Sequence, residues 1–482
     1  MAWRLTQTAP FEAENALEAS LRVAFESLQP SLRPPFSLSI PTPDQYALLN
    51  GAILHGALTE PHFSKTHIKH LHAIVTDGYA TFVNLLLDAV LQLYPKLLHS
   101  AKTQLLWLTE EMVHVLAIGY DAVLVSLLRQ IGAADCTEGN LNLCSELVTL
   151  FLKQFDRLLE DAPHVLSSAL YAFLRILSDQ FRVCVEKLET LKRLDIEKLE
   201  TLKRREIHLC VKIVREEFHL CLKIGRDFIR LLQDLAHVPE FKALLQDIVF
   251  NPSVFNVVGF KDVSQIYCTR TSSRYSLLRI SPEMETQLRF WLTDIKLGHH
   301  RRHQLWFANK FLNERDKEFL IVDIVRFICC AHHPPNEIIQ SDIFPRWALI
   351  GWLLTCCRKK HVEESVKLAL FYDWLFFDER MDSIMNIEPA ILLMVHSVPK
   401  FINMTHALLE FLLHLVDRYD VGRRSVIVKG VSSAFQLLVR KGVVRSLNVL
   451  TSCSALNPGL REGLKRLLSD GKVGSSKGFL PG

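Results

Sequence analysis

The fold is decided by stretches such as YATFVNLLLDAVLQLYPKL, residues 79–97. The large apolar side chains of this stretch recur every three or four positions, so they share one face of an α-helix. They are Tyr79, Phe82, Val83, Leu86, Leu87, Val90, Leu93, Tyr94 and Leu97. A second stretch with the same period runs from Ile207 to Leu232. Such faces are stable only when other helices cover them, so the pattern predicts packed amphipathic helices.

The helical period continues along most of the 482 residues. Ser281-Pro282 and Asn251-Pro252 each place a capping side chain before a proline, which is typical of a helix start. Gly119 and Asp121 indicate a boundary between two helices. No alternating apolar and polar run is bounded by hairpin turns, so we expect no β-sheet. We therefore predict an all-α fold, an irregular helical repeat array of HEAT or armadillo type.

The two ends of the sequence differ in composition from the middle. Five prolines lie between residues 30 and 43, and proline disfavours helix. Residues 1–43 are therefore expected to form an N-terminal segment and a proline-rich linker, and residues 44–470 the helical repeat domain. Residues 471–482 are small, polar and rich in glycine, so we expect a disordered tail.

One octapeptide, EKLETLKR, occurs at residues 186–193 and again at 197–204. A period of 11 residues turns a helix by about three full turns, so the repeat keeps its leucines near one face. These leucines are Leu188, Leu191, Leu199 and Leu202. We interpret the repeat as a tolerated duplication in an exposed helix, and a coiled-coil contact is the alternative.

The charge and cysteine content restrict the class of protein. The formal net charge is only +4, which argues against a chain that grips nucleic acid tightly by itself. The 11 cysteines are scattered, and residues 1–10 carry no signal-peptide pattern, so we expect free thiols in a reducing compartment. The longest apolar runs, such as Trp347–Cys357, are shorter than the roughly 20 residues that cross a bilayer. These features are typical of a protein of the nucleus or the cytoplasm.

The known motifs of catalysis and cofactor binding are absent from the sequence. We find no dinucleotide fingerprint, phosphate-binding loop, Gly-x-Ser-x-Gly or His-Glu-x-x-His, so we expect neither an enzyme nor a cofactor. The histidines at positions 55, 62, 67, 70 and 72 are interpreted as polar surface. Cys329-Cys330 and Cys356-Cys357 are interpreted as thiols buried at helix ends, because adjacent helical residues diverge by about 100° and cannot share one metal ion.

Two groups of residues are candidates for binding a partner. Arg301 and Arg302 precede Trp306 and Phe307, a combination that binds phosphate and stacks bases. An acidic protein partner and a plainly solvated helix face are the alternatives. The second group surrounds the aromatic run FYDWLFF, residues 371–377, which is typical of a core but also of a binding hot spot. Its members are Asp373, Trp374, Phe377 and Asp382. We expect the exposed members of both groups to contact partners.

Several long segments are distinctive enough to indicate a family. They read TQLLWLTEEMV (residues 103–113), IGRDFIRLLQDLAHVPEFK (224–242), ISPEMETQLRFW (280–291), HPPNEIIQSDIFPRWALIGWLLT (333–355), LALFYDWLFF (368–377) and DSIMNIEPAIL (382–392). On these segments the chain resembles the amino-terminal half of the Integrator complex subunit 3 family. Members of that family also belong to the SOSS complex, the sensor of single-stranded DNA. The resemblance extends from about residue 45 to about residue 470.

The resemblance implies a HEAT-like helical scaffold without catalytic activity. It implies two direct partners, an OB-fold protein that binds single-stranded DNA and a small third subunit of the SOSS complex. That complex acts in the nuclear DNA damage response and in DNA repair by homologous recombination. The family also belongs to the Integrator complex, which carries out small nuclear RNA (snRNA) 3' processing and transcription termination, so other Integrator subunits are implied partners.

The chain also departs from the family pattern. The duplication near Glu186 resembles an insertion, and the family's long carboxy-terminal half has no counterpart here. That half mediates self-association in the family, so self-association is not expected to carry over. The alternative to a scaffold is a helical repeat protein that binds nucleic acid directly through a stripe of Arg and Lys side chains.

Overall fold

The computed structural model describes residues 4–7, 13–36, 41–132, 135–187, 193–313 and 315–473. These residues form 26 α-helices and five short 3-10 helices. The β-type pairing in this part of the chain consists of two isolated bridges, Thr6 with Leu97 and Lys296 with Ile343. The prediction of an all-α fold is therefore confirmed.

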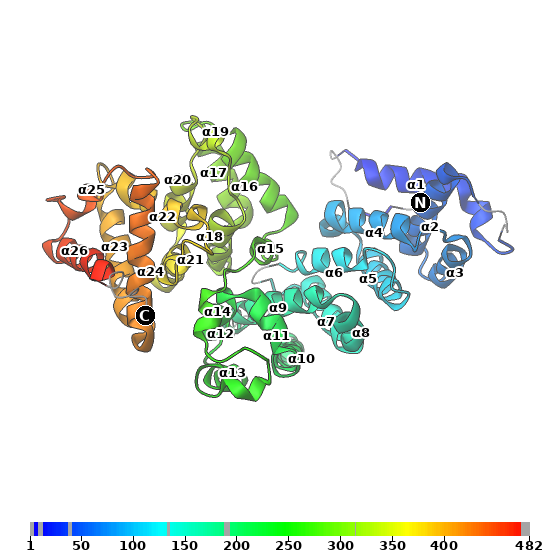
Figure 1. Ribbon diagram of the computed structural model, residues 1–482. Coiled ribbons are helices and arrows are strands. Elements are labelled where there is room, and N and C mark those ends of the chain that lie inside the picture. The colour runs from blue at the N-terminus through cyan, green and yellow to red at the C-terminus, as the bar shows by residue number, and fades with distance from the viewer. Residues whose placement is uncertain are drawn as a thin grey trace, which may run out of the picture. The chain divides into compact units, whose positions relative to one another are not determined.

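The helices are grouped into two compact units (Figure 1). Unit 1 comprises residues 1–173 and 190–213, and unit 2 comprises residues 174–189 and 214–482. The long helix α9 contributes its first half to unit 1 and its second half to unit 2. We describe each unit by itself.

Unit 1 is built from ten helices, of which α9 and α10 extend into residues of unit 2. Helices that follow one another in sequence pack together, such as α1 with α2, α2 with α3 and α5 with α6. Their bounds are α1 Ala16–Leu28, α2 Pro43–Thr59, α3 Ser64–Ile74, α4 Ala80–Gln92, α5 His99–His114, α6 Tyr120–Leu128, α7 Glu138–Lys153, α8 Phe155–Asp161, α9 Pro163–Lys187 and α10 Arg193–Glu216. The 3-10 helices are Gln29–Leu32 and Tyr94–Lys96.

Residues 1–43, expected as an N-terminal segment and a proline-rich linker, contain helix α1. Leu21, Ala24 and Phe25 of this helix are buried, and α1 packs on α2. The approach is close, since a Cβ atom on Gly56 of α2 would lie 2.8 Å from the Phe25 ring. The segment thus supplies part of the core of unit 1.

The duplicated octapeptide EKLETLKR is described in full only in its second copy. There Leu199 and Leu202 are buried in α10, while Leu188 and Leu191 of the first copy lie outside the described residues.

The interpretation of the histidine group as polar surface was wrong for three of its members. His55, His67 and His70 are buried in unit 1, because they share the apolar faces of α2 and α3. The Nε2 atom of His67 lies 2.8 Å from the Glu60 carboxylate, which also accepts a hydrogen bond of 2.9 Å from Arg33. Burial lowers the pKa of His67 in spite of this neighbouring carboxylate. The Glu60 carboxylate is thus the hydrogen-bonding partner of both the His67 ring and the Arg33 guanidinium group.

Unit 2 contains sixteen further helices, which pack in overlapping pairs such as α20 with α22, α22 with α23 and α21 with α24. Their bounds are α11 Phe218–Ile224, α12 Arg226–Asp234, α13 Pro239–Phe250, α14 Ser264–Cys268, α15 Ser273–Leu277, α16 Pro282–Asp294, α17 Arg301–Phe311, α18 Leu320–Cys330, α19 Asn336–Ile339, α20 Arg346–Cys356, α21 Lys360–Leu375, α22 Ile384–Ser397, α23 Ile402–Arg418, α24 Arg424–Arg440, α25 Asn448–Thr451 and α26 Pro458–Val473. The 3-10 helices are Pro252–Phe255, Arg315–Phe319 and Val421–Arg423.

The predicted helix boundaries agree with the structure to different degrees. Helix α16 begins at Pro282, and the Ser281 hydroxyl accepts a hydrogen bond from the backbone N–H of Met284, as predicted. Gly119 has a φ of 89° and α6 begins directly after it, but Asp121 lies within the first turn and is not the cap. The side chain of Asn251 caps nothing, and the residues after it form a single 3-10 turn.

Candidate docking site

The second candidate group, around the aromatic run, lies inside unit 2. Asp373, Trp374 and Phe377 are buried, and the side chain of Asp382 has no exposed surface. Helix α21, which carries the run, packs against α18, α22, α23 and α24. With helices on so many sides, the C-terminal part of α21, which carries the run, is covered all round. The burial of these four side chains removes them from the surface that a partner could touch.

The two aspartates of this group belong to a buried ion cluster. The Asp373 carboxylate accepts hydrogen bonds from Arg326 Nη1 at 3.0 Å and from Arg226 Nη1 at 3.4 Å. Arg226 also donates to both carboxylate oxygens of Asp382, at 3.0 and 3.1 Å. Burial alone would raise the pKa of Asp373, but the two guanidinium groups outweigh it and hold that pKa well below its usual range. The cluster stabilises the junction of α12, α18 and α21.

The arginines of this cluster were not singled out in the sequence. Arg226 and Arg326 each stand within an apolar stretch, in IGRDFIRLL and in IVRFICC. Charged residues inside otherwise apolar helical stretches are the signal that could have found them, because charged residues are almost never fully buried unless they are paired. Their partners lie 47 and 147 positions away, so the pairing itself depends on the tertiary structure.

The first candidate group lies on helix α17 and is mostly exposed. Arg301 and Arg302 are exposed, and Trp306 retains 42% of its surface. The ammonium group of Lys310 lies 5.1 Å from the centre of the Trp306 ring. Phe307 is the exception, because its ring is fully buried 5.1 Å from that of Trp291. Three of the eight candidate residues are therefore available on the surface.

An apolar groove lies beside this group, on the same unit. It has a volume of about 630 Å³ and is bounded by residues of α17, α20, α22 and the start of α23. Its lining consists of Leu297, His300, Gln304, Phe344, Trp347, Ala348, Gly351, Trp352, Thr355, Leu393, Ser397, Lys400, Phe401, Ile402, Asn403 and Met404. We call it the aromatic groove, after its two tryptophans and two phenylalanines.

The aromatic groove is built on a close approach of two helices. A Cβ atom on Gly351 of α20 would lie 2.9 Å from Leu393 of α22, so a glycine at this position lets the two helices meet. The Trp352 ring packs 5.9 Å from Trp291, which fixes its orientation. Phe401 at one edge is 67% exposed and Leu297 is 56% exposed. The groove thus combines a packed base with an uncovered apolar rim.

The polar groups of the aromatic groove carry positive charge or none. No aspartate or glutamate occurs among its sixteen lining residues, while Lys400 is exposed at its edge. The His300 ring stacks on Phe344 at 4.4 Å, and its Nδ1 accepts a hydrogen bond from the backbone N–H of Gly298. Partial burial, with a smaller contribution from Arg301, lowers the pKa of His300. Because Nδ1 accepts this hydrogen bond, the neutral form of the ring carries its proton on Nε2.

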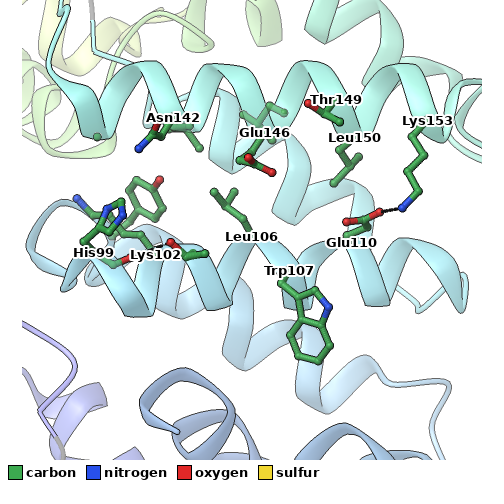
Figure 2. A pocket seen from close by; sticks show the side chains of 15 residues that line it. His99, Lys102, Leu106, Trp107, Glu110, Asn142, Glu146, Thr149, Leu150 and Lys153 are labelled. Atoms are coloured by element: carbon green, nitrogen blue, oxygen red, sulfur yellow. Dashed lines mark hydrogen bonds and ion pairs between the residues drawn. The ribbon is translucent and has the colours of Figure 1, made fainter. Parts of the chain in front are cut away.

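A second groove, of about 410 Å³, lies in unit 1 between α5 and α7. Figure 2 shows Leu106 between the two helices, His99 and Lys102 at one end, and Trp107 pointing away. An ion pair between Lys153 and Glu110 connects the helices at the other end. Because charges of both signs line this groove and some pair with each other, it is less suited to an apolar ligand than the aromatic groove.

Of the two predicted pairs of buried cysteines in unit 2, the first agrees with the structure. Cys329 and Cys330 are buried at the end of α18, and burial raises the pKa of Cys329 to about 12, so its thiol is protonated. Cys356 and Cys357 lie at the end of α20 but are only half-buried. The described residues contain no group of three or more His, Cys, Asp or Glu side chains placed to hold a metal ion. None of the described helices is long and apolar enough to span a bilayer.

Comparison with known proteins relates this helical chain to one family. The family model described as Integrator complex subunit 3 N-terminal matches residues 44–466. An Integrator complex subunit 3 homolog from Dictyostelium discoideum is 37% identical over 422 residues, which cover 87% of this chain and 27% of that protein. Integrator complex subunit 3 from Homo sapiens is 35% identical over 414 residues, which cover 86% of this chain and 38% of that protein.

The chain spans about a quarter to two fifths of the length of these relatives. Among solved structures, the NOT1 superfamily homology domain from Chaetomium thermophilum aligns over 94% of this chain and 99% of its own. Its identity is 12% and its TM-score is 0.32, which is too low to support an argument. On the family match and the identities, the chain belongs to the Integrator complex subunit 3 family and corresponds to the family's N-terminal region.

Proposed function

We propose that this chain is a non-catalytic scaffold subunit that assembles an OB-fold single-stranded-DNA-binding protein and a small third subunit into a SOSS-type complex. The complex acts in the nuclear response to DNA damage and in repair by homologous recombination. The same scaffold contributes to an Integrator complex that processes snRNA 3' ends and terminates transcription. Membership of the Integrator complex subunit 3 family supports the proposal.

The observation that carries the proposal is the uncovered aromatic groove of unit 2. Aromatic anchors contribute much of the binding energy of protein interfaces, and this groove leaves Phe401 exposed and Trp347 and Trp352 partly exposed. The charge distribution also supports a scaffold, because many arginines of unit 2 form ion pairs inside the unit, such as Arg226 with Asp373. A scaffold with a near-neutral net charge fits a complex in which the OB-fold partner supplies the DNA contacts.

Fluorescence anisotropy with a labelled single-stranded oligonucleotide tests this division of labour. The chain alone, the OB-fold protein alone and their co-purified complex are compared over a series of salt concentrations. We expect the complex to bind tightly with a steep salt dependence, and the chain alone to bind weakly with a shallow one. If the isolated chain binds as tightly and as steeply as the complex, DNA binding is not delegated to the partner.

Direct binding of nucleic acid is the second candidate function, and the exposed group on α17 favours it. Arg301, Arg302 and Trp306 place two cations and an uncovered ring on one helix, which suits phosphate and base contacts. Replacing both arginines by alanine should then weaken oligonucleotide binding and flatten its salt dependence. Arg380→Ala, at an exposed arginine of the same unit, is the matched control. Unchanged binding in the double variant would leave the scaffold as the better description.

A further inference from the structure

We propose that the aromatic groove binds an apolar segment of a protein partner that carries Asp or Glu side chains beside its apolar ones. The inference rests on the proposed scaffold function and adds the chemistry of the segment that is held. It is argued from the size of the groove, its exposed rim and its charge.

The size of the groove suits several side chains of a peptide. Its volume of about 630 Å³ lies within the range of about 300–1,000 Å³ that is typical of well-formed binding sites. The small or aliphatic residues Ala348, Gly351 and Leu393 line it together with the larger rings. Gln304 and Asn403 also line it, and their side-chain amides can bond to the backbone of a bound segment.

The rim of the groove includes exposed apolar side chains. Phe401 is 67% exposed, Leu297 is 56% exposed, and Leu305 on the neighbouring face of α17 is 65% exposed. Clustered exposed side chains of this kind mark interaction sites, whereas single exposed ones need no explanation. A partner segment that covers them removes their apolar surface from water, at about 25 cal/mol for each Å².

The charges around the groove favour a bound segment of negative charge. Lys400 is exposed at its edge, and Arg301 is exposed in the first turn of α17, one residue after His300 of the lining. Among the described residues, neither Lys400 nor Arg301 forms an ion pair with a carboxylate. By contrast, the nearby Lys296 already pairs with Asp342 at 2.9 Å. An acidic flank on the segment would complement the two available cations, and a basic flank would be repelled.

The same geometry disfavours nucleic acid in this groove. Bases bind on open aromatic faces beside a track of cations, as Trp306 with Arg301 and Arg302 would provide. In the groove, however, Trp347 and Trp352 are only partly exposed, and the Trp347 ring stacks on His396 at 4.7 Å. The rest of the lining combines apolar side chains such as Leu297, Leu393 and Ile402 with uncharged polar ones and Lys400, so it fits Leu, Ile, Met or Phe side chains better than polar base edges.

Selection of random peptides displayed on phage tests the proposal with the full chain. Peptides are selected on the wild-type chain after depletion on the Phe401→Asp variant. The enriched peptides should combine large apolar residues with Asp or Glu. In fluorescence anisotropy, Phe401→Asp should weaken their binding about tenfold or more, and Lys400→Glu should weaken it about threefold or more. Replacing the acidic residues of a peptide by lysine should restore its binding to Lys400→Glu.

The control is Phe250→Asp, because Phe250 is 75% exposed and lies on α13 away from the groove lining. This variant should bind the peptides like the wild type. Enrichment of basic peptides, no enrichment, or equal affinity for Phe401→Asp and wild type would overturn the proposal. The proposal would also be overturned if Phe401→Asp abolished the binding of a labelled oligonucleotide but left the binding of the peptides unchanged. Co-purification of the wild-type chain with the OB-fold protein is scored separately, so that a failed scaffold function is distinguished from a wrongly assigned groove.

Discussion

Removing one negative charge from the buried ion cluster should strongly lower the free energy of unfolding of unit 2. Asp373 lies between Arg326 and Arg226, and all three side chains are at most 2% exposed. Asp373→Asn keeps the shape of the side chain and leaves Arg226 its pair with Asp382 and Arg326 its pair with Asp227, but the buried cluster as a whole loses one negative charge. Loss of one partner from a buried pair costs about 3–5 kcal/mol. At about 2–4 °C for each kcal/mol in a domain of this size class, the melting temperature should fall by about 10 °C.

The matched control is Asp342→Asn in the exposed pair with Lys296, whose side chains are 65% and 59% exposed. An exposed pair contributes about 0–1 kcal/mol, so this variant should melt close to the wild type. Thermal melts followed by circular dichroism, and urea unfolding followed by tryptophan fluorescence, measure both variants. If Asp373→Asn costs no more than Asp342→Asn, the cluster does not stabilise unit 2 as argued.

The pH dependence of the same variant gives an independent test. The pKa of Asp373 is lower in the folded chain than its value of about 3.9 in an unfolded chain. Its stabilising contribution is therefore complete above about pH 4 and is lost as the pH falls through the folded-state pKa. The difference in unfolding free energy between wild type and Asp373→Asn should accordingly shrink below pH 4. A difference that grows on acidification would contradict the assignment.

Three further predictions concern unit 2. Burial lowers the pKa of His332 to about 4, so the unfolding free energy of the wild type should fall by about 2–3 kcal/mol between pH 7 and pH 4.5. His332→Gln should reduce that fall, and urea unfolding at the two pH values measures it. Gly225 has a φ of +81°, and a Cβ atom would lie 2.5 Å from the carbonyl oxygen of Thr269, so Gly225→Ala should cost about 3 kcal/mol or more in thermal unfolding. Ser281→Ala removes the cap of α16 and should cost about 1 kcal/mol, with full recovery by Ser281→Asp; equal stability of Ser281→Ala and wild type would exclude the cap.

Local features of the sequence determined the helices themselves. The apolar period of residues 79–97 gives the buried face of α4, and Ser281-Pro282 marks the start of α16. The apolar stretch that ends in Cys329-Cys330 becomes a buried helix end in α18. These features depend on backbone geometry within one or two turns, so a short window of sequence contains the information they need.

The tertiary structure decided which side chains the molecule offers to partners. All seven residues of the run 371–377 are buried because α21 packs against four other helices, and no local pattern distinguishes that from a half-covered helix. His67 became a core residue whose ring lies against the Glu60 carboxylate, which in turn accepts hydrogen bonds from Arg33. The aromatic groove brings together residues from Leu297 to Met404, which lie far apart in sequence. Burial and charge pairing depend on long-range contacts, and it was these contacts that left Arg301, Arg302 and Trp306 exposed while they enclosed Asp373 and Trp374.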